Sequence, residues 1–179
     1  MSWVTAARTP QSDTTHNPSR VLGDFAAAQP REGIVPRSYV FNHLHCVFST
    51  KNRAQLIRDP RALWDYMRGI ARNCGFSVLA IGGTENHVHV LLSVPAKLTL
   101  LEIMRDLKAN SSRFMKERVA GFSWQDGYSA LSVSPSQVGI VKRYIANQAE
   151  HHSRQPFDAE YLALLKKAGV PIERDEALG

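Results

Sequence analysis

The chain has 179 residues, 44% of them hydrophobic and 21% charged, which is enough for one compact domain with tails. Its formal net charge of +6 favours a polyanionic partner, and its only cysteines, Cys46 and Cys74, exclude a disulfide framework and a zinc knuckle. The sequence contains neither an apolar stretch of about 18 residues nor a secretion signal, so we expect a cytoplasmic protein without membrane contact.

Residues 1–37 are polar and proline-containing and have no sustained apolar period. Such a segment cannot bury enough apolar surface to fold, so it is predicted to be a mostly disordered leader. A short helical turn is expected near residues 21–28. The ordered domain is expected to span residues 38–170 and to be followed by a flexible tail at 171–179.

The first half of the domain reads as strand, helix and hairpin. Residues 39–50 are rich in aromatic and β-branched side chains, which is typical of a strand. A helix over about 60–74 is predicted from Asp59-Pro60 at its start and Gly75 at its end. Two further strands, at 76–81 and 87–94, are separated by a short connection and should pair as a hairpin.

The second half is predicted to be mainly helical. Thr99 can cap a long helix, with Glu102 placed for a capping box. A short strand is expected at 129–133, and Ser134-Pro135 then starts a helix that carries both Tyr144 and Gln148. A last helix is expected at about 158–167.

This order of elements predicts the fold class. Strand, helix, strand, strand, helix, strand is the βαββαβ pattern of a ferredoxin-like α+β sandwich with an antiparallel sheet, here with additional C-terminal helices. The first strand and the strand at 87–94 should lie next to each other in the middle of the sheet. The fold hosts many activities, so function must be argued from particular residues.

His87-Val88-His89 is a candidate metal site. Side chains alternate along a strand, so the two imidazoles share one face of the sheet while Val88 packs on the other. Neutral imidazoles bind divalent metals, but a lone His-x-His pair is more often structural. His43-Leu44-His45 has the same local form, and spacing alone does not choose between the two pairs.

Tyr144 and Gln148 are candidates for the same site. They are four residues apart and therefore share one face of a helix, where a phenol and an amide can address one bound ion. A glutamine oxygen is a hard ligand that suits Mg²⁺ or Mn²⁺. A buried tyrosine on a helix is, however, usually part of a core.

Together these residues resemble those of the HUH single-tyrosine transposases, particularly the branch that includes REP-associated tyrosine transposases. In that family two histidines flank a hydrophobic residue, and a downstream helix carries the catalytic tyrosine. The resemblance covers about residues 38–170 and places His43-Leu44 outside the motif. It is carried by the stretches at 45–53 (HCVFSTKNR), 85–92 (ENHVHVLL), 124–134 (WQDGYSALSVS) and 144–152 (YIANQAEHH).

The resemblance implies a site and a reaction. His87, His89 and Gln148 would be metal ligands, Tyr144 would be the nucleophile, and the ion would be Mg²⁺ or Mn²⁺. The expected activity is metal-dependent cleavage and rejoining of single-stranded DNA, at hairpin or REP-like sequences, through a 5′-phosphotyrosine intermediate. The family also implies a homodimer, with the tyrosine helix serving either its own subunit or the other.

Basic residues at several places are expected to bind DNA phosphates, although solvated helix faces are the simpler explanation for any one of them. Trp124 and Tyr128 could stack on unpaired bases or pack the C-terminal helices against the sheet. His151 and His152 could contact DNA phosphate or assist the metal site, although their place near a helix end favours simple capping. The predicted DNA-binding residues are Lys51, Arg53, Arg105, Lys108, Arg113, Lys142 and Arg143.

One alternative is a catalytically silent, domesticated regulator that binds nucleic acid on the same fold. An RNA-binding ferredoxin-like module is less consistent with the sequence, because its aromatic strand motifs are not evident. A replication-initiator nuclease is disfavoured by the small size of the chain.

Overall fold

In a computed structural model of the chain, the structure describes residues 39–152 and 156–171. The predicted leader at 1–37 and all but the first residue of the predicted tail at 171–179 lie outside this part. The elements in chain order are β1 (His43–Ser49), the 3-10 turn η2 (Lys51–Arg53), α1 (Pro60–Cys74), β2 (Ser77–Gly83), β3 (His87–Ser93), α2 (Leu100–Lys116), β4 (Ser129–Val133), the 3-10 turn η3 (Pro135–Gln137), α3 (Val138–Ala146), α4 (Gln148–His152) and α5 (Phe157–Lys167).

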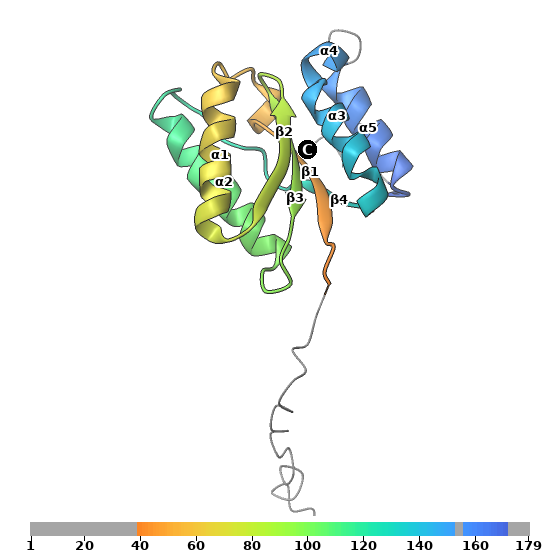
Figure 1. Ribbon diagram of the computed structural model, residues 1–179. Helices are drawn as coiled ribbons and strands as arrows, with labels where there is room; N and C mark the ends of the chain where they lie inside the picture. Colours follow the sequence, from red (N-terminus) through yellow and green to blue (C-terminus); the bar gives the residue numbers. More distant parts are fainter. Residues whose placement is uncertain (1–38, 153–155, 172–179) are drawn as a thin grey trace, which may run out of the picture. The chain divides into compact units, whose positions relative to one another are not determined.

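The four strands form one antiparallel sheet in the order β2-β3-β1-β4 (Figure 1). This order confirms the predicted ferredoxin-like α+β fold. Strands β1 and β3 are the central neighbours, in a register that pairs Val47 with His89 and Ser49 with His87. Residues from two distant parts of the sequence therefore meet at the centre of the sheet.

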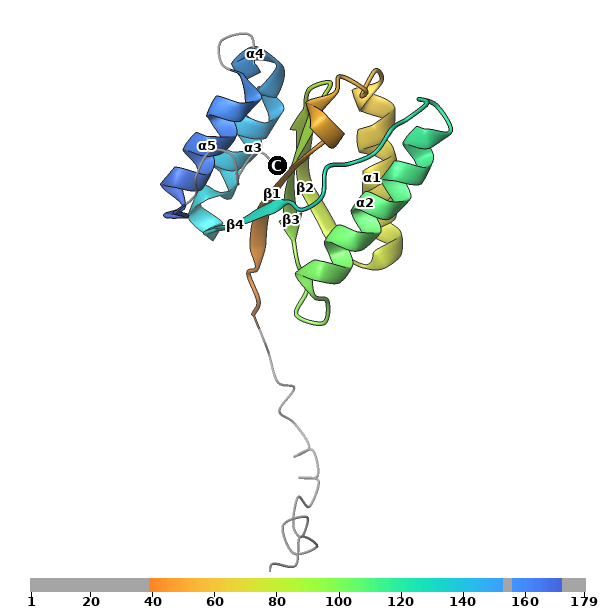
Figure 2. The same cartoon turned by 180° about the vertical axis from the view of Figure 1, so that it is seen from behind.

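Helices cover both faces of the sheet. Helices α1 and α2 lie on one face, and α3, α4 and α5 lie on the other (Figures 1 and 2). Helix α1 begins at the predicted residue, because the Asp59 side chain accepts a hydrogen bond from the Ala62 amide, and it ends at Gly75 with φ +78°. The capping box of Thr99 and Glu102 on α2 is also confirmed.

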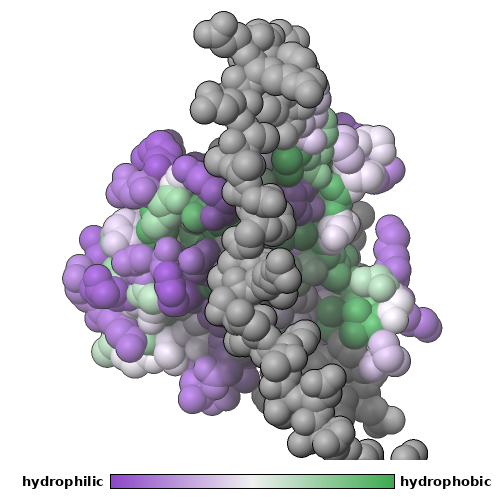
Figure 3. Space-filling model, turned by 90° about the horizontal axis from the view of Figure 1, so that it is seen from below, coloured by the Kyte–Doolittle hydropathy of each residue, from purple (hydrophilic) through white to green (hydrophobic). Residues whose placement is uncertain are grey.

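The main hydrophobic core lies between the sheet and the layer of α1 and α2. Alternate strand residues supply it, because every second side chain points to the same face. Figure 3 shows mostly hydrophilic side chains on the outer side of these helices, as expected of amphipathic helices with one buried stripe. Fully buried members of this core include Cys46, Leu63, Met67, Val88, Val90, Leu92 and Leu107.

The strand predicted at 39–50 is shorter than expected. Strand β1 begins at His43, which pairs with Ser93 on one side and with Val133 on the other, where both neighbouring strands end. The preceding residues have no strand to pair with, and Tyr39 and Phe41 are 77% and 68% exposed. None of the described helices is long and apolar enough to span a membrane.

Candidate active site

Three buried histidines lie on the sheet face that carries α3, α4 and α5. They are His45 on β1 and His87 and His89 on β3, with exposures of 4%, 0% and 0%. Their rings form a continuous group, with centroids 5.2 Å apart for His45 and His89 and 5.0 Å apart for His87 and His89. The alternation of β3 therefore brings the His87 and His89 side chains to one place, as the sequence pattern predicted.

Hydrogen bonds fix the orientation of both β3 histidines. Nδ1 of His89 lies 3.0 Å from Nε2 of His45, and Nδ1 of His87 lies 2.8 Å from Oδ1 of Asn86 and 3.1 Å from Oγ1 of Thr84. In a neutral imidazole whose Nδ1 donates, Nε2 carries the free lone pair. The second His-x-His pair thus contributes His45 as a partner of His89.

The three ligand atoms predicted from the sequence are Nε2 of His87, Nε2 of His89 and Oε1 of Gln148. All three are buried and form no hydrogen bond of ordinary geometry, although the Gln148 side chain lies against His87. Buried polar atoms with incomplete hydrogen bonding are costly, so three of them in one site indicate that a ligand completes it. Two imidazole nitrogens and one amide oxygen form a suitable donor set for Mn²⁺ or Mg²⁺.

Burial keeps these imidazoles neutral. It lowers the pKa of His45 to about 4 and that of His87 to about 3, and it holds the pKa of His89 well below its usual value. At neutral pH all three rings are therefore unprotonated, which is the state that can coordinate a cation.

Helix α3 brings Tyr144 to the histidines of its own chain. The Tyr144 ring centroid lies 5.8 Å from that of His89 and 5.9 Å from that of His45. Helix α3 approaches strand β2 closely at Gly82, where a Cβ atom would lie 2.3 Å from the backbone oxygen of Ile145. Glycine at this position thus allows the tyrosine helix to rest on the sheet.

The single helix predicted to carry both Tyr144 and Gln148 is interrupted, and this prediction was wrong. Helix α3 ends at Ala146, Asn147 turns the chain, and α4 begins at Gln148. The two side chains nevertheless meet, because the Tyr144 hydroxyl and the Gln148 amide nitrogen both donate to Oε1 of Glu160. Spacing predicted their proximity although the helix does not continue between them.

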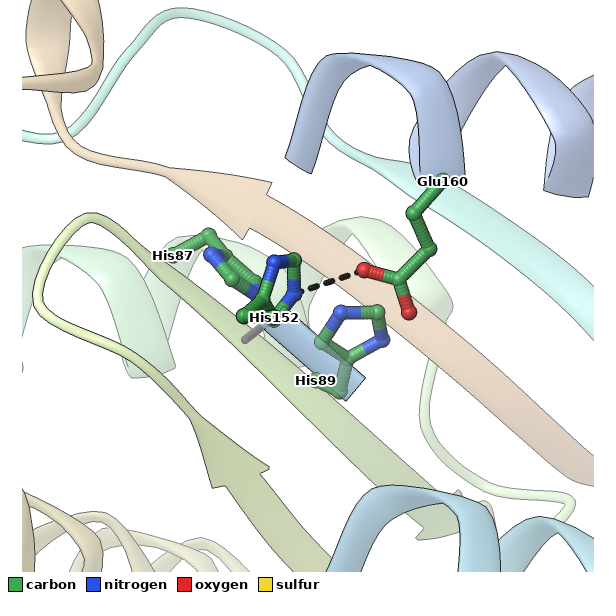
Figure 4. Close-up of side chains that lie close together, drawn as sticks. All are labelled: His87, His89, His152 and Glu160. Atoms are coloured by element: carbon green, nitrogen blue, oxygen red, sulfur yellow. Dashed lines mark ion pairs between the residues drawn. The ribbon is translucent and has the colours of Figure 1, made fainter. Parts of the chain in front are cut away.

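Sequence reasoning missed Glu160 and treated His152 as a helix cap. Glu160 on α5 is 8% exposed, and its Oε2 lies 2.7 Å from Nε2 of His152. Figure 4 shows both side chains directed toward His87 and His89, and one potential ligand atom from each of these four residues lies within 4.8 Å of the others.

Burial raises the pKa of Glu160 to about 7. No local motif marks Glu160, since its position depends on how α5 folds back. The side chain of His151 lies outside the described part.

The predicted DNA-binding residues fall into two groups. Lys51 and Arg53 follow β1 in η2, and Lys142 and Arg143 are exposed on α3. Arg53 also forms an ion pair of 2.7 Å with Asp158 at the start of α5. These four residues belong to elements that adjoin the histidine face of the sheet or pack on it.

The other three predicted DNA-binding residues lie on α2, on the opposite face. Arg105 and Arg113 are exposed, and Arg105 pairs with Asp106. Lys108 donates to the carbonyl oxygens of Gln125 and Gly127 at 2.8 and 2.6 Å, which ties α2 to the segment before β4. The structure therefore does not bring the α2 residues to the candidate site.

Trp124 packs in the main core. Its ring lies 4.9 Å from that of Phe48 and 4.8 Å from that of Phe122, and its indole nitrogen donates to Ser111 on α2. Only 7% of the residue is exposed, so its ring is not available to stack on a base. It packs against the α2 side of the sheet and not, as one prediction had it, under the C-terminal helices.

A pocket of about 590 Å³ opens beside the buried histidines, at His45. It lies among β4, α3 and α5, and His45 and Val141 are among the residues that line it. Ser132, Gln137 and Lys167 supply polar groups to its wall. The pocket thus connects the histidine face of the sheet with the surface.

Comparisons with known proteins point to one family. The family model described as IS200-like transposase matches residues 39–148. The ISDra2 transposase TnpA of Deinococcus radiodurans is 30% identical over 123 residues, covering 63% of this chain and 88% of the relative. A crystal structure of a putative transposase from D. radiodurans R1 matches with a TM-score of 0.50 at 28% identity, covering 64% of this chain and 97% of that one. A REP-associated tyrosine transposase bound to a REP hairpin shares the fold, with a TM-score of 0.52 at 16% identity and coverage of 66% and 73%.

Proposed function

Since this chain belongs to the IS200-like transposase family and is therefore a DNA transposase, we propose that it cleaves and rejoins single-stranded DNA through a 5′-phosphotyrosine on Tyr144. One observation carries the proposal. The ring of Tyr144 lies beside the buried imidazoles of His45 and His89, and the ligand atoms of His87, His89 and Gln148 are buried without a hydrogen bond of ordinary geometry. A nucleophile next to a donor set of this kind is what metal-assisted phosphoryl transfer requires.

In this proposal His87, His89 and Gln148 hold one divalent ion, Mg²⁺ or Mn²⁺. The ion would polarise the scissile phosphate and neutralise its developing charge. The burial of the two histidine Nε2 atoms and of Oε1 of Gln148, without a hydrogen bond of ordinary geometry, supports this assignment. His45 would keep His89 in the required tautomer by accepting a hydrogen bond from Nδ1 of His89, which lies 3.0 Å from its Nε2.

The chain's own residues then supply the attack. The Tyr144 oxygen bonds to phosphorus, and the bond from phosphorus to the 3′ oxygen breaks, which leaves a free 3′-hydroxyl. The phenol loses one proton and the departing oxygen gains one, so the step is balanced. Because the phosphotyrosine keeps the energy of the original diester, a 3′-hydroxyl can later attack it and rejoin strands without a nucleotide cofactor.

We further propose a DNA hairpin with a single-stranded extension as the substrate. Support comes from the exposed Lys142 and Arg143 on α3 and from Lys51 and Arg53 beside the site, which can bind phosphates. The structural relative bound to a REP hairpin suggests the same substrate class. We also propose a homodimer, to be tested by light scattering, in which each subunit uses its own Tyr144.

The test is formation of a covalent adduct. Purified protein is incubated with Mn²⁺ and hairpin-containing single-stranded DNA from its own genomic flank, and denaturant-resistant protein-DNA adducts are measured. The Tyr144→Phe variant should form none, while Tyr128→Phe should retain adduct formation as a matched control. Adduct formation by Tyr144→Phe would refute the assigned nucleophile. Absence of adduct with the unaltered chain would instead favour a silent DNA-binding regulator.

A further inference from the structure

Helix α5 contributes to the candidate site although it lies beyond the part of the chain that the family model matches. The match ends at residue 148, and α5 spans Phe157–Lys167. Its residue Glu160 is 8% exposed, and its carboxylate points toward the histidines (Figure 4). A carboxylate is seldom buried unless its oxygens are paired, so its partners reveal what it does.

Glu160 contacts three side chains that follow one another at intervals of four residues. Tyr144 and Gln148 donate to its Oε1, Gln148 at 2.9 Å, and His152 lies 2.7 Å from its Oε2. The helix is broken at Asn147, between Tyr144 and Gln148. The relative position of phenol and amide is therefore set by their shared bond to one oxygen as well as by the backbone.

The contact also determines which way the Gln148 amide faces. The amide nitrogen of Gln148, and not its oxygen, faces Glu160, because the nitrogen donates to Oε1 of that carboxylate at 2.9 Å. Oε1 of Gln148 is then turned away from Glu160, and it is buried and forms no hydrogen bond of ordinary geometry, with its side chain against His87. Since a cation binds the oxygen and not the nitrogen of an amide, this orientation is the one that metal binding needs.

Helix α5 is anchored at two further points, which fixes where Glu160 lies. The Phe157 ring stacks on His87, with centroids 4.2 Å apart and an angle of 18° between the planes. Asp158 pairs with Arg53 in η2. The carboxylate is thus held by contacts to β3 and to the turn after β1, independently of the tyrosine helix that it meets.

We propose that Glu160 is a positioning residue that orients the Tyr144 hydroxyl for attack and turns the oxygen of Gln148 toward the metal. The proposal rests on the proposed function, because it assigns Glu160 a task in that same site. It adds α5, outside the matched region, to the catalytic apparatus. Glu160 acts through Tyr144 and Gln148 and need not touch DNA or the ion.

The test compares Glu160→Ala and Glu160→Gln with the unaltered chain. Three quantities are measured: the Mn²⁺ affinity by calorimetry, the single-turnover rate of adduct formation at saturating hairpin DNA, and the Kd for that DNA. Glu160→Ala should lower the adduct rate on the order of tenfold to a hundredfold, as expected for a misplaced nucleophile, while the Kd for DNA stays within about twofold. Its Mn²⁺ affinity should fall by about tenfold.

Glu160→Gln keeps an oxygen that can accept from Tyr144 and has nearly the same shape, so it should recover part of the adduct rate. The exposed and remote Glu117→Gln is the matched control and should behave like the unaltered chain. If Glu160→Ala fails to fold, Glu160→Gln still tests the proposal. An adduct rate and an Mn²⁺ affinity of Glu160→Gln equal to those of the unaltered chain would overturn it. If the unaltered chain forms no adduct, the proposed function fails, whereas the Mn²⁺ measurement still tests the role of Glu160.

Discussion

The two faces of the sheet differ in what their side chains do. The face under α1 and α2 is lined by Cys46, Phe48, Val88 and Val90 and forms the main apolar core. Among the described residues, the face under α3, α4 and α5 carries a small apolar cluster, formed around Leu91, Val133 and Ile145, beside the buried histidines. One strand, β3, supplies both faces by alternation.

This difference shows how one small domain separates stability from chemistry. Apolar burial on the α1 and α2 side contributes stability in proportion to the area removed from water. On the opposite side, buried imidazoles, an amide and a carboxylate lose hydration and must recover it through partners or a ligand. Changes on the first face should therefore alter folding, and changes on the second should alter binding and catalysis.

The largest effect is expected from removing the two β3 histidines. His87→Ala/His89→Ala should abolish measurable Mn²⁺ binding, because two of the three proposed ligands are removed. Calorimetric titration with Mn²⁺ measures this, and circular dichroism verifies the fold. His43→Ala removes a histidine from the other His-x-His pair and should leave the affinity unchanged. Undiminished Mn²⁺ binding by the double variant would show that these residues are not ligands.

A substitution in the apolar core should have the converse effect. Leu107→Ala on α2 removes a side chain with 0% exposure and should lower the free energy of unfolding by about 2–5 kcal/mol. Urea denaturation measures the change, and Leu101→Ala, at a position that is 71% exposed, should have little effect. The comparison of faces fails if Leu107→Ala lowers Mn²⁺ affinity under conditions in which the variant is fully folded.

A smaller effect is expected from His45, which supports a ligand. His45→Ala removes the hydrogen bond to Nδ1 of His89 and should weaken Mn²⁺ binding by roughly 10–100-fold, as is typical for partners of metal-bound histidines. His45→Gln, which keeps an acceptor, should recover part of the affinity. Equal affinities of the unaltered chain and of His45→Ala would assign His45 to packing alone.

The smallest effect concerns DNA phosphates. Lys142→Gln/Arg143→Gln on α3 should reduce the magnitude of the salt slope of single-stranded DNA binding by about 1.4, that is about 0.7 for each phosphate that the variant no longer neutralises. Arg105→Gln/Arg113→Gln removes the same charge from α2, on the opposite face, and is expected to change the slope less. Fluorescence anisotropy at several salt concentrations measures both. A larger change from the α2 pair would place the DNA on the other side of the sheet.

Much of the fold follows from local patterns. The start and end of α1, the capping box of α2 and the bounds of β4 all agree with the sequence predictions, since capping residues and alternation act over a few positions. The beginning of β1 was placed too early, because a strand ends where its partners end. The break at Asn147 was missed because the residues around it keep a helical spacing.

The sequence by itself determined that His87 and His89 share a face, that Tyr144 and Gln148 lie near each other, and that the topology places β1 beside β3. These features depend on the periodicities of strands and helices and on the order of the elements along the chain. Only the tertiary structure decided that His45 supports His89, that Tyr144 reaches the histidines of its own chain, and that Glu160 joins the site. His45 and His89 are 44 positions apart and Tyr144 and Glu160 are 16 apart, and no local spacing encodes packing between such distant residues.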